Sequence, residues 1–553
     1  MPIETIVTPD AIARYTAAGF WGSRIWTDDI DETAEAAGDR IALIDSIGAL
    51  TYRELRLGID RLALHLLDLG VRKEERFGIQ LPNWRDFVFM RFALAKIGAV
   101  AVPLPTDYRR KEVDYVLGTT EASGVLIPER YRGRQYVEEY QELLPSLPAV
   151  RNVLVARSGG ALPSGWRSLR EMLDTPSESG RFADVLRAVR PGANEVDLVV
   201  TTSGSTAAPK LVVRTPNCFL TTTRQWVEHR GLLAPGDVVA GLAPIARGVG
   251  YWIGVAAPVV GRCTMALLEQ FTPDGALRWI AETRATVAIA VPAQIVKMLQ
   301  VPDLETYDLS SLRLFVNGGA AIPPSAAEEL ERRFGCVTMS AYGAVEGGIP
   351  TSTKIDDPPD KRFRTVGQLL PGMEMRIVDD DGRALPIGSP GELVYRGPNL
   401  SVGFWRDIPA YRRLFDGDGW FKSGDLGVID GEGYLTIVGR KKEIVIRGGI
   451  NISPTEVEGL LQEHPAIRQI AIVKMPDPVF GERCCAYIVP APGATVTVES
   501  LAVFLEAREV AKYKFPERVE LLDELPTTGE GGKVLRRALE DDIRTKLERE
   551  GKV

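Results

Sequence analysis

The sequence predicts an α/β protein with a large N-terminal domain of doubly wound sheets, a small β-rich segment and a small α+β C-terminal domain. Three observations support this. From about Ile41 onward, short apolar runs alternate with helical patterns, which is typical of doubly wound sheets. After Pro371, strands are joined by Asp-Gly turns. Residues 441–553 then form a tail with helices and strands of its own.

The elements follow one another in a regular order. Residues 41–44 form the first expected strand, and Thr51 caps a helix whose buried face carries Leu62, Leu66 and Leu69. The further expected strands are 77–81, 99–102, 124–127, 153–155, 198–200, 286–290, 314–316 and 391–395, with a helix at 87–97. In the tail we expect a helix at 457–461 and strands at 470–473 and 486–489.

Length and composition narrow the class of protein. A chain of 553 residues is too long for one hydrophobic core. A net charge of -8 argues against general nucleic-acid binding, and no apolar run is long enough to span a membrane. The N-terminus lacks the features of a signal peptide, and the five cysteines are scattered without a paired framework. We therefore expect a soluble, cytoplasmic protein with reduced thiols.

Residues 422–458 are the most informative part of the chain. They contain an acidic turn that ends in Asp425, then a short strand and a charged joint at 439–442. A glycine pair, Gly448 and Gly449, precedes the next helix start. This order suits a nucleotide site beside a movable joint.

A polar loop follows the expected strand 198–200. Its hydroxyls, backbone N–H groups and lysine can wrap a polyphosphate, although no G-K-[S/T] sequence makes it a Walker loop. Taken alone, the loop is also compatible with a polar surface turn. The nucleotide-binding candidates here are Thr202, Ser203, Gly204, Ser205, Thr206 and Lys210, with Thr206 also a candidate metal ligand.

A second candidate segment, 340–348, reads S-A-Y-G-A-V-E-G-G. Tyr342 can lie flat against a purine, and Glu346 can bind Mg²⁺ through carboxylate oxygen. The alternative is a buried aromatic ring beside a solvated glutamate. The nucleotide-binding candidates in and before this segment are Gly318, Gly319, Ala320, Ala341, Tyr342, Gly343 and Val345.

The C-terminal domain adds one cation of interest, Lys533, on the glycine-rich loop 525–533. A lysine on such a loop suits a charge that moves in to neutralise a developing carboxylate–phosphate transition state. A plain surface lysine is the alternative.

Together these motifs resemble the adenylate-forming superfamily of acyl- and aryl-CoA ligases, luciferase and peptide-synthetase adenylation domains. The form R-G-G-x-N-I-S-P-x-E-V-E at 447–458 is similar to that of acyl-CoA ligases. Segments 17–26 and 81–88 are similar to the aryl-acid ligase branch. The resemblance covers nearly the whole chain.

The resemblance implies a large domain, 1–440, and a small mobile domain, 441–553, that turns about Lys442. A carboxylic acid would be activated with ATP and Mg²⁺ as an acyl-adenylate and then transferred to the thiol of CoA. Asp425 and Arg440 would contact the ribose, and Gly448 and Gly449 would line the pantetheine tunnel. The implied catalytic residues are Lys533, Glu346, Lys210 and Gly449.

The acid pocket departs from the aryl-acid ligases. Those enzymes have a histidine and an asparagine where this chain has Arg247 and Gly248, so a dihydroxybenzoate or salicylate substrate is not expected. Tyr251 and Trp252 could form apolar walls, and Arg247 could cover the pocket, meet a polar group or lie at the surface. The expected pocket residues are Arg247, Gly248, Tyr251, Trp252, Gly318 and Gly347.

The other departures fall on the adenylation machinery. The family has glycine at the positions of Ala207 and Leu211 and threonine at that of Val345, and its lysine comes one residue earlier than Lys533. We therefore hypothesise that adenylation is weakened or lost, while transfer from a supplied acyl-adenylate survives.

Two alternatives stay open. The acceptor could be the phosphopantetheine of a carrier protein, whereas a basic patch formed by Lys512, Lys514 and Arg483 would favour the 3′-phosphate of CoA. The chain could also be a nucleotide-binding regulator that lost the chemistry.

Overall fold

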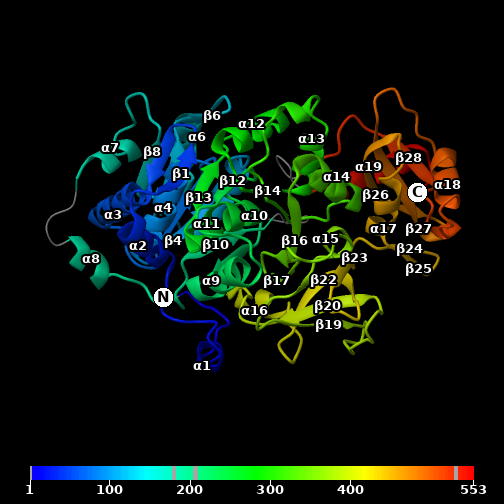
Figure 1. The fold of residues 1–553 in the computed structure, drawn as a ribbon, viewed down its shortest axis with the longest axis horizontal. Helices are drawn as coiled ribbons and strands as arrows, with labels where there is room; N and C mark the ends of the chain where they lie inside the picture. Colours follow the sequence, from blue (N-terminus) through cyan, green and yellow to red (C-terminus); the bar gives the residue numbers. More distant parts are fainter. Residues whose placement is uncertain (1–2, 177–181, 203–208, 528–532, 553) are drawn as a thin grey trace.

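The computed structural model describes residues 3–176, 182–202, 209–527 and 533–552. A large N-terminal domain and a small C-terminal domain, both of mixed helices and strands, lie side by side along the long axis of the molecule (Figure 1). The expected α/β fold class is confirmed.

The first large sheet has the strand order β21-β11-β10-β4-β3-β5-β8-β9, in which β10 to β9 run parallel and β11 and β21 are added antiparallel. Its strands are β3 (Arg76–Ile79), β4 (Val100–Pro103), β5 (Gly124–Pro128), β8 (Asn152–Ala156), β9 (Arg167–Ser168), β10 (Leu198–Thr201), β11 (Leu211–Arg214) and β21 (Gly403–Phe404). The antiparallel β10–β11 pair brackets the polar loop.

The second large sheet has the order β18-β17-β16-β15-β14-β12-β13-β1-β2, again parallel in its middle and antiparallel at both ends. Its strands are β1 (Ile41–Asp45), β2 (Gly48–Thr51), β12 (Val238–Gly241), β13 (Thr264–Leu267), β14 (Val287–Ala290), β15 (Leu314–Asn317), β16 (Val337–Ala344), β17 (Gly348–Ser352) and β18 (Gln368–Leu369). Both large sheets contribute to one core cluster.

The helices of the large domain are α1 (Pro9–Ala17), α2 (Trp26–Ala37), α3 (Tyr52–Asp68), α4 (Arg85–Lys96), α5 (Arg110–Thr120), α6 (Tyr136–Leu143), α7 (Leu169–Asp174), α8 (Phe182–Ala188), α9 (Pro216–Arg224), α10 (Gly248–Tyr251), α11 (Ala257–Gly261), α12 (Pro273–Thr283), α13 (Pro292–Leu299), α14 (Pro324–Phe334), α15 (Pro359–Arg364) and α16 (Ile408–Arg412). The N-terminus of α3 is a capping box, because the Glu54 N–H donates to Thr51 Oγ1 and the Thr51 N–H donates to Glu54 Oε2. Leu62 and Leu66 are buried as expected, and Leu69 lies partly buried at the C-cap.

The β-rich segment forms an antiparallel sheet at the lower edge of the large domain in Figure 1, and β6 and β7 form a separate short hairpin. Their strands are β19 (Glu374–Val378), β20 (Gly391–Arg396), β22 (Phe421–Ile429) and β23 (Leu435–Arg440), and β6 (Arg130–Tyr131) with β7 (Arg134–Gln135). Strand β23 ends at Arg440, so the chain enters the small domain directly from this sheet.

The small domain is one sheet with a core on each face. Along the hairpin of β26 and β27, Ile470, Ile472 and Ile488 face one core, whereas Val473 and Tyr487 face the other, as the alternation of side chains in strands requires. Helices α17 and α18 cover the first core and α19 covers the second. The elements are β24 (Val445–Arg447), β25 (Ile450–Ile452), β26 (Ile467–Asp477), β27 (Gly481–Pro490), β28 (Arg518–Leu521), α17 (Pro454–Leu461), α18 (Val498–Glu506) and α19 (Arg536–Arg549).

The state of the cysteines and the presence of membrane-spanning helices can be compared with the structure. Each of the five cysteines is buried and unpaired. Within the described residues, no helix combines the length and the apolar character needed to cross a bilayer.

A buried ion pair joins Arg91 on α4 to Asp197, the residue immediately before β10. Arg91 is fully buried, and it donates from Nη2 to Asp197 Oδ2 over 2.5 Å and from Nε to Tyr251 Oη over 2.8 Å. The pair therefore ties a helix that is buried on every side to the start of the first sheet's central strand.

Replacing Asp197 with alanine should lower the free energy of unfolding by about 3–5 kcal/mol, because Arg91 would stay buried without its anion. Tyr251→Phe removes one hydrogen bond and no charge, so it should cost less, about 1.5–3 kcal/mol. Denaturant titration followed by tryptophan fluorescence measures both. Equal costs for the two variants would contradict the assignment of the larger effect to the buried charge.

Candidate active site

Asp425 lies at the point where the β-rich sheet, the second large sheet and the entry to the small domain meet. It is 5% exposed and sits on β22, directly opposite Arg440 on β23. Its Oδ1 accepts from Arg440 Nε over 2.7 Å, and its Oδ2 accepts from the hydroxyl of Tyr342 over 2.5 Å. A carboxylate held in this way presents acceptor positions next to an aromatic ring and a cation.

The surroundings of Asp425 raise the pKa of both of its partners, Arg440 and Tyr342. Burial alone would lower the pKa of Arg440, but the attraction of Asp425 outweighs it and the pKa is raised. Burial, followed by the neighbouring Tyr395 and Asp425, raises the pKa of Tyr342 well above its usual value. Tyr342 is therefore a hydrogen-bond donor at neutral pH, and Arg440 is a permanent cation.

Glu346 lies in the turn between β16 and β17, close to the polar loop. Lys210 Nζ is 3.3 Å from Glu346 Oε1. The N–H of Thr202 donates to the carbonyl of Lys210 over 3.0 Å, so the β10–β11 hairpin fixes where Lys210 leaves the sheet. Ser203, Gly204, Ser205 and Thr206, the other nucleotide candidates of this loop, and Ala207 lie outside the described residues.

The glycines after Glu346 are required by close packing. A Cβ at Gly347 would lie 2.1 Å from the hydroxyl of Tyr395, and a Cβ at Gly348 would lie 2.1 Å from the carbonyl oxygen of Asn399. Gly348 also has φ of +68°. The turn that carries Glu346 is therefore held tightly against the core, and Gly347 serves packing beneath the turn.

The candidates at 318–320 follow the carboxyl end of β15. Gly319 has φ of +86°, and a Cβ there would lie 3.3 Å from Val249 Cγ2. Asn317 on β15 pairs with Ser340 on β16, so this turn and the segment with Ala341, Tyr342 and Gly343 leave the same edge of the second sheet. Ligands of open α/β sheets bind at the carboxyl ends of the strands.

Lys533 of the small domain lies within electrostatic range of this cluster. Burial among surrounding protein atoms lowers the pKa of Lys533, and the charge of Arg440 lowers it further, whereas Asp425 and Glu346 act in the opposite direction. The side chain keeps solvent-accessible surface, so it lies in an open seam with protein on most sides. The one-residue displacement seen in the sequence therefore does not keep Lys533 away from the cluster.

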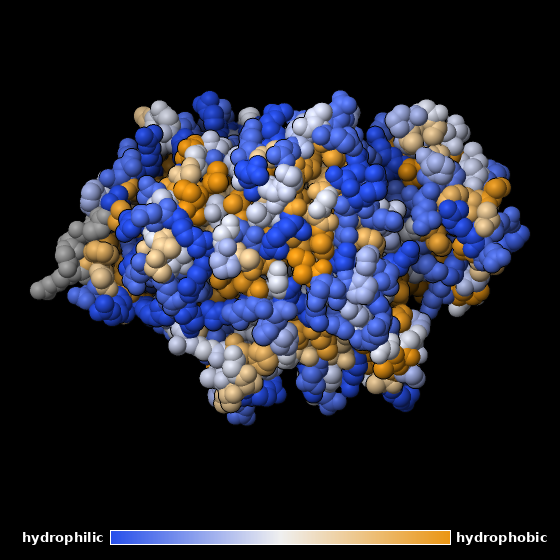
Figure 2. All heavy atoms as spheres, viewed as in Figure 1, coloured by the Kyte–Doolittle hydropathy of each residue, from blue (hydrophilic) through white to orange (hydrophobic). Residues whose placement is uncertain are grey.

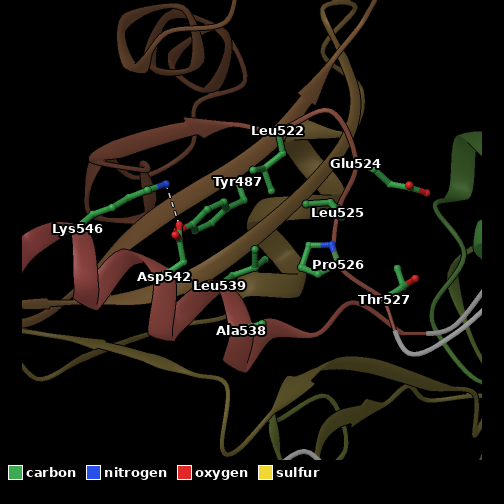
Figure 3. Close-up of a pocket in the computed structure, with 10 residues that line it drawn as sticks. All are labelled: Tyr487, Leu522, Glu524, Leu525, Pro526, Thr527, Ala538, Leu539, Asp542 and Lys546. Carbon is green, nitrogen blue, oxygen red and sulfur yellow. Dashed lines mark hydrogen bonds and ion pairs between the residues drawn. The ribbon is translucent and has the colours of Figure 1, made fainter. Parts of the chain in front are cut away.

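The stem of the Lys533 loop is well anchored. The Leu535 N–H donates to the Pro526 carbonyl over 2.8 Å, and Thr527 bridges to Val534. A hollow of about 480 Å³ lies beside the stem (Figure 3). It is lined by Tyr487, Leu522, Glu524, Leu525, Pro526, Thr527, Ala538, Leu539, Asp542 and Lys546. Asp542 accepts from the Tyr487 hydroxyl and pairs with Lys546, so these polar groups of the hollow satisfy one another.

The glycine pair forms the turn of the β24–β25 hairpin. Arg447 pairs with Ile450, and Gly448 and Gly449 between them have φ of +56° and +85°. A two-residue turn with both φ values positive is of type I′, which favours glycine for conformational reasons alone. In this arrangement of the domains the pair is exposed, and a Cβ at Gly449 would meet no described atom within 4 Å.

The expected acid pocket is divided into a rim and a buried wall. Arg247 donates from Nη2 to both carboxylate oxygens of Asp107, over 2.7 and 2.9 Å, so it meets a polar group at the rim. A Cβ at Gly248 would lie 3.7 Å from Val345 Cγ2. Tyr251 and Trp252 are buried in the core behind this rim.

Sequence reasoning missed Asp107 and did not show that Leu211 is buried. Asp107 follows the carboxyl end of β4, a position that the strand prediction itself could have flagged. Leu211 is 4% exposed and belongs to the core cluster, so its side chain packs away from the loop.

Two protein-family models and several curated relatives match the chain over most of its length. A family model described as AMP-binding enzyme matches residues 30–405, and one described as AMP-binding enzyme C-terminal domain matches residues 456–532. Medium-chain fatty-acid–CoA ligase of Escherichia coli (strain K12) is 34% identical over 540 residues, covering 97% of this chain and 93% of that protein. 2,3-Dihydroxybenzoate-AMP ligase of Bacillus subtilis (strain 168) is 30% identical over 546 residues, covering 98% of this chain and 97% of that protein.

The fold agrees with a solved structure. The crystal structure of the anthranilate CoA ligase AuaEII in complex with anthranoyl-AMP superposes with a TM-score of 0.86 at 23% identity, covering 95% of this chain and 98% of that one. With both domains matched in order, the chain belongs to the AMP-binding enzyme family, the adenylate-forming superfamily of ligases.

Proposed function

We propose that the protein is an acyl-CoA ligase that converts a carboxylic acid to an acyl-adenylate and then to a CoA thioester, with adenylation the slower half. The observation that supports this most is the cluster around Asp425, to which both domains contribute. The cluster brings together an aromatic ring, a carboxylate that can accept from ribose hydroxyls, and the charge of a lysine from the small domain.

In the first half, a carboxylate oxygen of the acid attacks the α-phosphorus of ATP, and pyrophosphate leaves as the α–β P–O bond breaks. The Tyr342 ring would contact the adenine and Asp425 the ribose hydroxyls. Lys533, close to Asp425 and Glu346, would offset the negative charge that develops between the acid and the phosphate. Lys210 would hold the outer phosphates from the base of its loop.

The site also fits Mg²⁺. Among the described residues, no group of three or more carboxylate, histidine or cysteine side chains is arranged to hold a metal. Mg²⁺ on a nucleotide is typically held by one or two carboxylates together with phosphate oxygens, and Glu346 supplies one carboxylate at the end of the phosphate loop. A bound Mg²⁺ would neutralise phosphate charge.

In the second half, the thiol of CoA attacks the acyl carbon and AMP leaves. The exposed Gly448–Gly449 turn must then reach the site, which requires the small domain to rotate. Contacts change at the proposed hinge: Lys441 pairs with Glu392 and Asp380 of the large domain, whereas the carbonyl of Lys442 accepts from Lys474 of the small domain. This change of partners supports a joint at Lys442, with Lys441 still in contact with the large domain.

Two of the sequence departures bear less on adenylation than expected. Leu211 packs into the core, and the charge of Lys533 is within electrostatic range of Asp425 and Glu346. Val345 still lacks the hydroxyl that the family pattern has at this position. These observations favour adenylation that is slowed rather than abolished.

The acceptor has one serious alternative, a carrier protein. Lys512, Lys514 and Arg483, the proposed basic patch, are ion-paired to Glu506, Glu456 and Asp477 over 2.8, 2.5 and 2.6 Å, so their charge is largely compensated. Exposed apolar side chains stand near the glycine turn: Ile446, Ile450 and Val479 are 52%, 44% and 77% exposed. Hydrophobic patches also interrupt the hydrophilic surface of the small domain in Figure 2. Apolar surface of this kind suits a protein partner.

Separate half-reaction assays test the proposed function. Lys533→Ala should slow pyrophosphate release from acid and ATP by on the order of 100- to 1000-fold, because a charge aimed at the transition state is lost. It should leave transfer from preformed acyl-adenylate to CoA within a few-fold of the unmodified protein. Gly449→Ala should show the reverse pattern.

Gly493→Ala is the matched control for Gly449→Ala, because Gly493 also has positive φ (+73°) and no described atom within 4 Å of its Cβ. If both glycine variants slowed transfer equally, turn strain and not a tunnel would be the cause. If the unmodified protein catalysed neither half-reaction yet bound AMP, the regulator alternative would replace the proposal.

The charge environment of Lys533 predicts its reactivity. Burial and Arg440 lower the pKa of Lys533, whereas Glu506 raises that of Lys512, so Lys533 has the larger fraction of neutral amine at any pH below both values. Competitive acetylation at pH 8 with mass-spectrometric readout should label Lys533 faster than Lys512. Slower labelling of Lys533 would contradict this, and added AMP should suppress labelling by occupying the seam.

Turnover with CoA and with a phosphopantetheine-loaded carrier protein separates the two acceptors. We expect a higher kcat/KM with CoA. Val479→Glu changes the exposed apolar surface and should leave CoA turnover nearly unchanged, whereas a marked loss confined to carrier loading would favour the carrier alternative.

A further inference from the structure

Arg214 is a buried cation next to the turn that carries Glu346. It ends β11 and is 2% exposed. Its Nη2 donates to the carbonyl oxygen of Val345 over 2.6 Å, and its guanidinium stacks on Phe219 and Trp252, with Cζ 5.0 and 5.2 Å from the ring centroids. Within the described residues, no carboxylate lies at ion-pair distance, and Nη1 has no hydrogen-bond partner.

Two further buried side chains hold the same turn by its backbone. Ser401 Oγ donates to the Val345 carbonyl over 2.6 Å, and the Tyr411 hydroxyl contacts the Glu346 carbonyl oxygen over 2.8 Å. Ser401 and Tyr411 are 1% and 0% exposed. The backbone on which Glu346 stands is thus fixed from below by side chains of three separate segments of the large domain.

Arg214 differs from the other two because it brings a net charge. A cation buried without an anion is unfavourable, and its burial lowers the pKa of Arg214. Glu346 is among the anionic groups whose charge acts on it. Two cations therefore lie close to the Glu346 turn. Arg214 donates to the carbonyl of the neighbouring Val345, and Lys210 pairs with the Glu346 carboxylate.

We propose that Arg214 is a positioning residue for adenylation, which orients Glu346 through the Val345 carbonyl and whose unpaired charge favours a polyphosphate at this turn. The proposal rests on the proposed function in one respect, that the Glu346 turn is the metal–phosphate site. It assigns Arg214 to the first half-reaction alone, because the β- and γ-phosphates of ATP have left as pyrophosphate before the second begins.

Arg214→Met should lower kcat/KM for Mg·ATP in pyrophosphate release by on the order of tenfold to a hundredfold, because a charged hydrogen bond is lost. Transfer from preformed acyl-adenylate to CoA should stay within about threefold. Arg214→Lys keeps the charge and should recover part of the loss.

The control is Arg230→Met. Arg230 is also a buried arginine, 6% exposed, whose Nη2 donates to backbone carbonyl oxygens, of Gln368 and Leu369, away from the Glu346 turn. Circular dichroism and thermal unfolding establish that both variants fold. If Arg214→Met and Arg230→Met impaired the two half-reactions alike, Arg214 would be a structural residue and the proposal would be overturned.

A binding measurement separates this inference from the proposed function. Calorimetric titration with Mg·pyrophosphate should show weaker binding by Arg214→Met than by the unmodified protein, while AMP binding stays the same. Unchanged Mg·pyrophosphate binding sinks the inference even if the enzyme is active. Absence of both half-reactions in the unmodified protein sinks the proposed function, and the binding comparison still decides the role of Arg214.

Discussion

The carboxylate of Asp425 has two oxygen atoms and joins three parts of the molecule. One oxygen is bonded to Tyr342 at the end of the second large sheet, and the other to Arg440, the last residue before the small domain. Because Asp425 and Arg440 face each other across the β22–β23 ladder, the register of that sheet sets the distance between them. A slip of one residue would turn one of the two side chains to the opposite face. The proposed nucleotide site and the exit toward the small domain thus depend on a single strand pairing.

Local patterns predicted strands such as β1, β3, β10 and β26 and the capped start of α3, because periodicity and capping are properties of neighbouring residues. The contact of 3.3 Å between Lys210 and Glu346 joins two motifs that are far apart in the sequence, and sequence patterns identified each residue without predicting the contact. The contacts of Arg247 with Asp107 and of Arg214 with Val345 join residues 140 and 131 positions apart, and no periodicity encodes them. Tyr251 was assigned to a pocket wall from the sequence. Its buried partner, Arg91, lies on a helix far away in the sequence, so the hydrogen bond between them could not be recognised from local patterns.

The glycine pair shows how one residue pattern can satisfy two requirements. The hairpin turn needs positive φ at Gly448 and Gly449 whether or not a thiol ever passes them. The motif therefore could not by itself establish the thioester-forming half as the better preserved one. In this arrangement of the domains Lys533 lies within electrostatic range of Asp425, whereas the glycine turn is exposed.

The small domain carries a closed core on each face of its sheet, so its apolar interior does not depend on the large domain. Contacts across the seam include polar ones such as Lys297 with Glu524, whose side chains are 41% and 72% exposed. Water can replace contacts of this kind at little cost, since exposed ion pairs contribute about 0–1 kcal/mol. If the small domain turns about Lys442 as proposed, it can therefore move with both cores intact and exchange only exposed contacts for water.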